Sequence, residues 1–167
     1  MDYEARCLPG ALLGRYQLVR RIGRGGMGSV FEARHVDLNK RVALKTLKPE
    51  FAQQPAIRAR FLREGVAASR IRHPNVADVT DVGVDDEIPY LVMEFLDGED
   101  LAKRVETSGP LGVTETIDLM LPVLAAVSTA HDEGVVHRDL KPANIFLSVN
   151  RHGVIAPKVL DFGISKI

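Results

Sequence analysis

Short apolar runs and alternating polar positions fill the first half of the chain, a pattern typical of β-strands. Glycine, proline or turn residues separate these runs. The predicted strands cover residues 16–22, 29–34, 41–47, 76–84 and 89–95. The first half is therefore expected to form a sheet, interrupted once by a helix.

That helix is predicted over residues 55–70, where apolar side chains recur at helical spacing. Glu64 lies in the middle of the apolar face, and a carboxylate in apolar surroundings is costly unless a cation meets it. Gly65 weakens the helix by roughly 1 kcal/mol relative to alanine. We therefore expect the helix to depend on tertiary packing. Its apolar face comprises Ile57, Phe61, Ala68 and Ile71.

The second half is expected to be mainly helical. A polar segment with a glycine, residues 96–100, is the natural boundary between two lobes. A short helix is predicted at 101–106, and Thr114 is expected to cap a longer one. Pro122 should kink this longer helix. Its expected apolar stripe comprises Ile117, Leu121, Leu124, Ser128 and His131.

The composition is ordinary for a soluble domain. The 167 residues are 46% hydrophobic and 26% charged, which permits one domain with a core. Basic and acidic residues both number 22, so net charge favours neither nucleic acid nor an anionic membrane as partner. The single cysteine, Cys7, cannot form an internal disulfide, and the longest uncharged run is too short to cross a bilayer. We expect a cytoplasmic protein without a membrane segment in this chain.

A glycine-rich run is the first candidate for chemistry. Residues 23–30 read G-R-G-G-M-G-S-V, with the spacing G-x-G-x-x-G-x-V. A dinucleotide-binding fold would place such glycines between a strand and a helix. Here they lie between two predicted strands, so the run is either a tight hairpin turn or a hairpin whose backbone N–H groups cover phosphates.

A lysine and a glutamate form the second candidate pair. Lys45 shares its strand face with the apolar residues Ala43 and Leu47. Glu64 is the carboxylate that needs a cation. Pairing the two satisfies both groups, either as a plain buried ion pair or as a glutamate that positions a phosphate-binding amine.

Two later segments concentrate charge. Residues 137–144 read H-R-D-L-K-P-A-N, and residues 161–163 read D-F-G. Short strands at 145–147 and 158–160 are predicted beside them, joined by an extended hairpin. Unpaired charges in such apolar surroundings cost several kcal/mol, on the order of 3–5, so the density of charge indicates function. A carboxylate at the end of a strand also suits a hard divalent cation.

Together these segments resemble the protein kinase family, most closely the bacterial eukaryotic-type Ser/Thr kinases. The glycine run, strand lysine, helix glutamate, H-R-D-L-K-P-x-N and D-F-G follow in the family's order. Lys141, two residues after Asp139, follows the Ser/Thr pattern rather than the tyrosine pattern. The resemblance implies an α+β, kinase-like, two-lobed fold, with a complete small β-rich lobe and a truncated helical large lobe.

The resemblance also implies a role for each matched residue, with ATP as cosubstrate and Mg²⁺, or alternatively Mn²⁺, as the metal. Asp139 would accept the hydroxyl proton, Lys141 would steady the γ-phosphate, and Glu64 would hold Lys45 on the α- and β-phosphates. Asn144 and Asp161 would bind the metal. The expected nucleotide-binding residues are Ile22, Gly23, Gly25, Gly26, Gly28, Val30, Ala43, Lys45, Met93 (as gatekeeper), Glu94, Leu96 and Asp100.

The predicted domain limits are 1–11 for an N-terminal extension, 12–96 for the small lobe and 97–167 for a partial large lobe. The segment that carries A-P-E and the later helices is expected to be missing, which would expose an apolar face of helix 113–132. The expected function is Ser/Thr protein phosphorylation, with a protein Ser/Thr hydroxyl as substrate and a parent protein that could be membrane-anchored. A non-catalytic ATP-binding or interaction module and, more remotely, a dinucleotide-dependent oxidoreductase are the alternatives.

Overall fold

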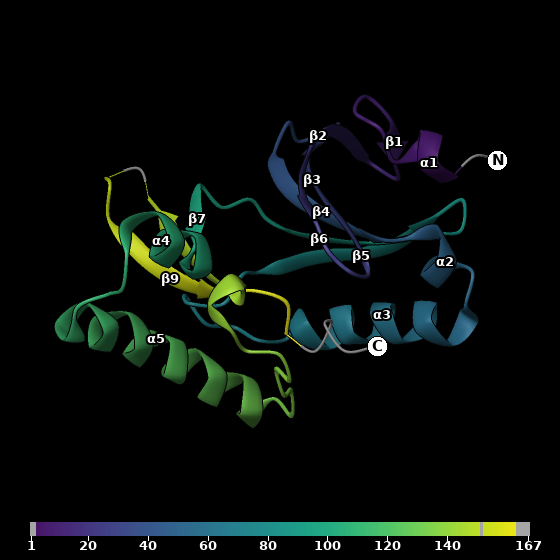
Figure 1. The fold of residues 1–167 in the computed structure, drawn as a ribbon. Helices are drawn as coiled ribbons and strands as arrows, with labels where there is room; N and C mark the ends of the chain where they lie inside the picture. Colours follow the sequence, from purple (N-terminus) through teal and green to yellow (C-terminus); the bar gives the residue numbers. More distant parts are fainter. Residues whose placement is uncertain (1–2, 151, 163–167) are drawn as a thin grey trace. The chain divides into compact units, whose positions relative to one another are not determined.

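The computed structural model describes residues 3–150 and 152–162, and these form two compact units (Figure 1). The first unit combines residues 3–69 with 79–95, and the second combines 70–78 with 96–162. Each unit has its own sheet and helices. The predicted lobe limits, 12–96 and 97–167, stay a prediction.

The first unit is built on a six-stranded antiparallel sheet with the order β1-β2-β3-β4-β6-β5. Its strands are β1 (Leu12–Leu13), β2 (Tyr16–Arg24), β3 (Gly28–His35), β4 (Arg41–Leu47), β5 (Val79–Asp85) and β6 (Ile88–Glu94). Four of the five predicted strands in this part of the chain are confirmed to within two residues at each end. The two-residue strand β1 and the short helix α2 (Pro49–Ala52) were not predicted, because neither is long enough to show a periodic pattern.

The predicted strand at 76–84 was wrong at its start, since β5 begins at Val79. Val76 instead pairs in parallel with Val159 of the second unit. The amide of Ala77 donates to the carbonyl of Val159 at 3.0 Å, and the amide of Val159 donates to the carbonyl of Asn75 at 2.8 Å. Residues 70–78 therefore belong with the second unit by their hydrogen bonds.

One side of the large sheet holds the core of the first unit. Leu44 is paired with Phe31 on one neighbouring strand and with Val92 on the other, and all three are at most 2% exposed. Because directly paired residues point to the same side of a sheet, these three define what we call the core face. Tyr3, Cys7 and Ala11 pack against this core. Residues 3–11, with helix α1 (Tyr3–Arg6), form the N-terminal segment, which covers part of the core face.

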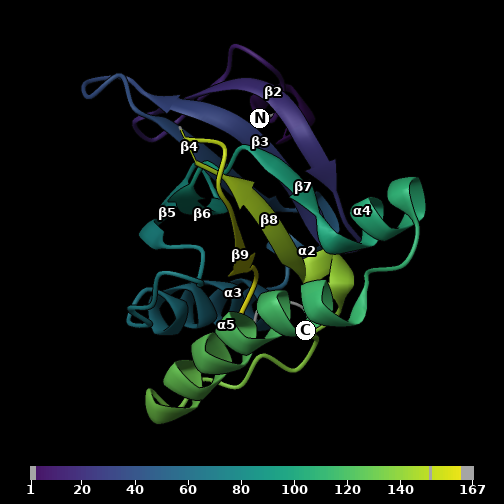
Figure 2. The same cartoon turned by 90° about the vertical axis from the view of Figure 1, so that its left-hand side faces the viewer.

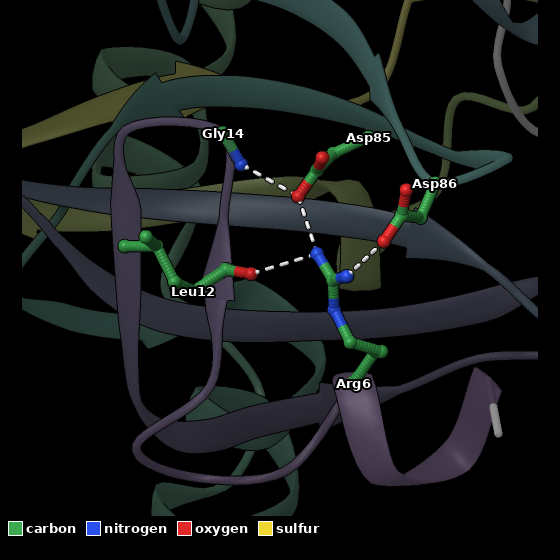
Figure 3. A network of polar contacts seen from close by, with 5 residues as sticks. All are labelled: Arg6, Leu12, Gly14, Asp85 and Asp86. Atoms are coloured by element: carbon green, nitrogen blue, oxygen red, sulfur yellow. Dashed lines mark hydrogen bonds and ion pairs between the residues drawn. The ribbon is translucent and has the colours of Figure 1, made fainter. Parts of the chain in front are cut away.

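Polar contacts fasten the N-terminal segment to the sheet (Figure 3). The guanidinium of Arg6 donates to the carboxylates of Asp85 and Asp86 and to the carbonyl of Leu12. Asp85 also accepts from the amide of Gly14 at 3.0 Å. One side chain therefore joins α1 and the nearby strand β1 to the end of β5, which is about 80 residues away in sequence.

Replacing Arg6 with alanine is expected to lower the stability of the first unit. The change removes hydrogen bonds to two carboxylates, each worth about 1.5–3 kcal/mol at most, with the exposed ones worth less. We expect the melting temperature to fall by roughly 3–8 °C in differential scanning calorimetry. Arg15→Ala is the control, because Arg15 lies 4.0 Å from Asp37 and both side chains are mostly exposed. Equal shifts for both variants would contradict the anchoring role.

The other side of the sheet carries helix α3 (Pro55–Ala68), which confirms the predicted helix to within two residues (Figure 1). Val30, Lys45 and Leu91 are paired across β3, β4 and β6 and define the Lys45 face. A Cβ atom added to Gly65 would lie 2.2 Å from Cδ2 of Leu91. Gly65 is thus required for close packing of α3 on this face, which explains why the helix tolerates a residue of low helix propensity.

The second unit combines a three-stranded sheet with two helices (Figure 2). The sheet contains β7 (Gly98–Asp100), β8 (Ile145–Val149) and β9 (Ile155–Val159), and the helices are α4 (Leu101–Ser108) and α5 (Val113–Asp132). A 3₁₀ turn, η1, covers Pro142–Asn144. The predicted strand at 158–160 was wrong by three residues at its start, because pairing extends along the hairpin to Val149 and Ile155.

Helix α5 differs from the prediction in two respects. Its N-cap is Gly112, not Thr114. The helix continues through Pro122, as expected, and the kink there stays a prediction. The buried residues are Val123, Ala126 and Ala130, whereas the predicted stripe faces outward, with Ile117, Leu121 and Leu124 exposed by more than half. The helix is apolar on both sides, so periodicity alone did not identify the packed one. The expected exposure of an apolar face on this helix is confirmed.

By length and composition α5 could also cross a membrane, a test that core helices of water-soluble proteins pass as well. The sequence-based expectation that the chain has no membrane segment considered only the uncharged run and therefore missed this candidate. The helix has its buried side against β9 in the second unit.

Candidate functional site

The glycine-rich run forms a β-hairpin between β2 and β3. Gly23 pairs with Val30, and the turn is closed by the amide of Gly25, which donates to the carbonyl of Gly28 at 2.9 Å. A Cβ atom at Gly28 would lie 1.8 Å from the carbonyl oxygen of Thr46, so the fold requires glycine there. Gly26 differs: a Cβ atom would meet nothing within 4 Å, and φ is not positive. The fold alone therefore does not explain glycine at position 26.

Several predicted nucleotide-binding side chains share the Lys45 face. Val30 is paired with Lys45, and Ala43 is paired with Met93. Ala43 and Met93 are 9% and 8% exposed, so they present small apolar surfaces beside the lysine. Ile22, at the end of β2, is 40% exposed. The sheet register thus places Val30, Ala43, Lys45 and Met93 on one face, although they lie on three strands and span 63 positions of the sequence.

Helix α3 places Glu64 on the same side of the sheet, because the next residue, Gly65, contacts Leu91, the cross-strand partner of Lys45. The Glu64 side chain is 14% exposed. Its Oε1 oxygen accepts from Nε of Arg60 at 2.9 Å. A cation therefore meets this carboxylate, but it is Arg60, which the sequence reasoning missed. Its position four residues before Glu64 was the available signal. The pairing of Glu64 with Lys45 stays a prediction.

The remaining nucleotide-binding candidates lie at the end of β6 and in the segment that follows it. Glu94 is the last residue of β6, and Leu96 is half-buried in the second unit. Asp100 is the N-cap of α4, where its Oδ1 oxygen accepts from the amide of Lys103 at 2.9 Å. This capping contact was not predicted, although an aspartate before a helix is a standard capping signal.

Asp139, Lys141 and Asn144 form one hydrogen-bonded group in the second unit. Lys141 Nζ donates to Asp139 Oδ2 at 2.8 Å. Asn144 Nδ2 donates to the backbone carbonyl of Asp139 at 2.8 Å and to its Oδ2 oxygen at 3.3 Å. The 3₁₀ turn makes this arrangement possible, because it curls the chain back so that residues two and five positions later reach Asp139.

This group lowers the pKa of the Asp139 carboxyl below its ordinary value. The main cause is the hydrogen bond from Lys141, supported by the charge of Lys141 and the bond from Asn144, while burial acts in the opposite direction. A lowered pKa means that the carboxylate stays ionised as the pH falls below the range of an ordinary aspartate. Asp139 is therefore an ionised acceptor near neutral pH.

The segment 160–162 is fixed beside this group. The amide of Leu160 donates to the carbonyl of Asn144 at 2.9 Å, and Nε2 of His137 lies 2.7 Å from the carbonyl of Leu160. The ring of His137 meets the ring of Phe162 edge-on at 4.9 Å. His137 and Phe162 were not assigned roles from the sequence. Their places in the segments H-R-D-L-K-P-A-N and D-F-G were the signal available.

Two residues near this group have a left-handed backbone. Asp161, which follows Leu160, has a φ of 58°, and Arg138 has a φ of 65°. Left-handed backbone at residues other than glycine costs on the order of 1 kcal/mol or more and concentrates at functional sites. Both residues border the Asp139 group. The glycine of D-F-G, Gly163, lies outside the described residues.

The donor set of Asn144 and Asp161 fits a divalent metal. The Asn144 amide nitrogen is turned toward Asp139, which leaves its Oδ1 oxygen as the atom for a hard cation. Among residues 3–150 and 152–162, no group of three or more His, Cys, Asp or Glu side chains gathers as a metal site. Two protein ligands suit Mg²⁺, which takes one or two side chains together with phosphate oxygens and water.

The structure thus divides the predicted residues into two groups. The glycine hairpin, Lys45 and Glu64 belong to the first unit, and Asp139, Lys141, Asn144 and Asp161 belong to the second. The role predicted for each group stays a prediction. The joining of both groups around one nucleotide stays a prediction.

Comparison with known proteins assigns the family. The model of the protein kinase domain matches residues 16–167. Ser/Thr-protein kinase Pkn1 of Myxococcus xanthus is 45% identical over 162 residues, which are 96% of this chain and 23% of the relative. Ser/Thr-protein kinase PrkC of Bacillus subtilis is 40% identical over 152 residues, 91% of this chain and 23% of the relative. The chain therefore spans about a quarter of the length of these curated relatives.

A solved structure agrees in fold. The crystal structure of the Mycobacterium tuberculosis PknI kinase domain superposes with a TM-score of 0.82 at 32% identity, covering 95% of this chain and 63% of that one. The range that the family model matches includes the glycine hairpin and the Asp139 group. The chain belongs to the protein kinase family, as the N-terminal part of a Ser/Thr kinase domain of the bacterial type.

Proposed function

We propose that this chain carries the ATP-binding and phosphoryl-transfer residues of a kinase that phosphorylates protein serine or threonine. The main support is the hydrogen-bonded group of Asp139, Lys141 and Asn144. A backbone hydrogen bond joins Asn144 of this group to Leu160, the residue before Asp161. Phosphoryl transfer requires mainly positioning and charge neutralisation. This group offers an acceptor, a cation and one oxygen ligand, and Asp161 would supply the second oxygen ligand.

The nucleotide is assigned to the Lys45 face and the glycine hairpin. The open space at Gly26 lets a phosphate approach the backbone without a side chain in the way. Lys45 would bind the α- and β-phosphates, with Glu64 holding its ammonium group. Gly23, Gly25 and Gly28 would cover the triphosphate together with Gly26. The remaining contacts, with the adenine and ribose, would come from Ile22, Val30, Ala43, Met93, Glu94, Leu96 and Asp100.

A divalent metal serves phosphoryl transfer in this family by neutralising the charge of the β- and γ-phosphates. We propose Mg²⁺, or alternatively Mn²⁺, with Asn144 Oδ1 and the Asp161 carboxylate as the protein ligands. The hydrogen bonds from Asn144 to Asp139 keep the amide oriented for this purpose.

Asp139 would orient the substrate hydroxyl and receive its proton as the oxygen forms a bond to the γ-phosphorus and the bond to ADP breaks. An acceptor that is already ionised suits this step. Lys141, bonded to Asp139, lies where a cation could also meet a γ-phosphate oxygen. We propose a protein substrate, no nucleic acid partner and a cytoplasmic location for the domain, in a parent protein that could be membrane-anchored.

Nucleotide binding by this chain tests the first part of the proposal. Excess ATP with Mg²⁺ should stabilise the chain by about 2.7 kcal/mol at 100 times the dissociation constant, seen as a higher melting temperature. Lys45→Met should lose most of the shift, and Lys40→Met, at an exposed turn position, should keep it. ATP binding without transfer to a basic protein, measured on a polypeptide with a complete kinase domain, would favour a non-catalytic module instead.

Replacing Glu64 with alanine is expected to reduce turnover more than nucleotide affinity. The change leaves the Lys45 ammonium in place but removes the carboxylate proposed to orient it. We expect kcat to fall about 10- to 100-fold with the KM for ATP changed by less than about threefold. Arg60→Ala is a useful comparison, because it removes the observed partner of Glu64 and leaves the carboxylate. Unchanged turnover in Glu64→Ala would refute the assigned pairing.

Replacing Lys141 with methionine is expected to shift the pH dependence of transfer. The hydrogen bond and charge of Lys141 lower the pKa of Asp139, so their loss lets this pKa rise. The ionised fraction of Asp139 would then be lost at a higher pH as acidity increases, and the acidic limb of kcat/KM should move to higher pH. Lys103→Met, at an exposed site on α4, should leave the limb in place.

A further inference from the structure

The core face of the large sheet carries a small pocket near the glycine hairpin, and several of the residues around it are basic. The pocket has a volume of about 270 Å³ and lies between the N-terminal segment and strands β2, β3 and β4. Its lining includes three cations, Arg21, Arg24 and Lys48. No aspartate or glutamate is among the lining residues in the described part of the chain.

The sheet register independently places these side chains on one face. Arg24 pairs with Ser29, and Ser29 pairs with Thr46, which forms one row across three strands. Arg21 pairs with Phe31 in the next row of the core face. Since alternate residues of an extended chain share a side, Lys48 follows Thr46 on it. Three cations and two hydroxyl groups therefore converge through the backbone arrangement.

Among the residues that the structure describes, the side chains of Arg21, Arg24 and Lys48 have no ion pair or hydrogen bond. The neighbouring Arg20 shows the contrast, because it lies on the Lys45 face and binds Glu32 at 2.7 Å. Like charges held close together without counter-charges repel one another. An anion would relieve this repulsion.

We propose that this pocket, formed by the N-terminal segment and the back of the glycine hairpin, binds a phosphate monoester. A phosphate dianion has three acceptor oxygens and about two negative charges, which match three cations and the nearby hydroxyls of Ser29 and Thr46. The volume lies below the roughly 300–1,000 Å³ of pockets for whole small-molecule ligands, so a single phosphate group fits better than a nucleotide.

The same phosphate chemistry can come from free phosphate or from a phosphorylated side chain. Leu8, which lines the pocket and is 56% exposed, offers an apolar contact to a residue beside a phosphorylated serine. The N-terminal segment that supplies Leu8 is held by Arg6 (Figure 3). The site is thus on the opposite side of the hairpin strands from Lys45 and does not depend on the proposed function.

The test is calorimetric titration of this chain, with Lys45→Met as background so that the nucleotide site does not contribute. The probes are inorganic phosphate, a capped peptide with one phosphoserine and one leucine, and its unphosphorylated form. The double variant Arg21→Gln/Arg24→Gln should weaken phosphopeptide binding by about tenfold or more, and Lys48→Met should weaken it as well. The control, Arg20→Gln, should change it by less than about twofold, because its charge lies on the other face.

Tighter binding of the phosphopeptide than of phosphate would identify a phosphoprotein ligand, whereas equal binding would identify free phosphate, and both support the site. Arg24→Lys should keep part of the affinity in a variant that folds normally by circular dichroism. Absence of binding by every phosphorylated probe would overturn the proposal. Equal losses in Arg20→Gln and the double variant would overturn it too, since they would indicate only the general charge of the surface.

Discussion

Replacing Asp161 with asparagine is expected to abolish metal-dependent phosphoryl transfer, with a loss of at least about 10³-fold in kcat/KM. The carboxylate is the one charged ligand proposed for the metal, and an amide cannot neutralise a divalent cation. The left-handed backbone at Asp161 tolerates asparagine nearly as well as aspartate, so the fold should survive. The change therefore isolates charge from structure.

The measurement combines transfer by a complete kinase domain with ATP binding by this chain, each with and without Mg²⁺. Wild-type binding should depend on the metal, and that dependence should disappear in Asp161→Asn. Asp118→Asn, at an exposed position on α5, controls for the loss of one negative charge. Retained metal dependence in Asp161→Asn would show that the metal is held elsewhere.

The second large effect is expected for Asp139→Asn, which should lower kcat by about 10²–10⁴-fold while the affinity for ATP stays nearly constant. Asparagine keeps a similar shape but cannot take up the hydroxyl proton. If its NH₂ group took the place of Oδ2, the hydrogen bond from Lys141 would be lost, because an amide NH₂ and an ammonium are both donors.

Single-turnover kinetics with a complete domain would separate this step from substrate binding. A variant of the same loop, Arg138→Lys, serves as comparison because it leaves the Asp139 group chemically unchanged. Normal single-turnover rates in Asp139→Asn would exclude Asp139 as the proton acceptor. Such rates would limit the proposed roles of Lys141 and Asn144 to positioning the phosphate, with no base in their group.

The sheet of the first unit illustrates how much local pattern can determine. Strands β2, β3, β4 and β6 were predicted within two residues because each alternates, or is continuously apolar, between strong breakers. Helix α3 was equally clear from its spacing. These features depend on residues that are close in the chain, so they can be recognised without knowing the partners.

Helix α5 shows where local pattern fails. Apolar residues occur on both of its sides. Only packing against β9 within the second unit decides that Val123, Ala126 and Ala130 are buried while Ile117, Leu121 and Leu124 are exposed. The expected cap at Thr114 was also wrong, since the N-cap is Gly112, two residues earlier, and glycine is accepted at that position.

For the candidate site, the sequence by itself determined the residue types and their order, because catalytic motifs are short and contiguous, and family membership agrees with them. Tertiary structure alone decided the contacts of His137 with Leu160 and Phe162 and the cover of the core face by the N-terminal segment. Most of these join residues far apart in the chain, and strand register and helix packing, which no local pattern encodes, set which of them meet.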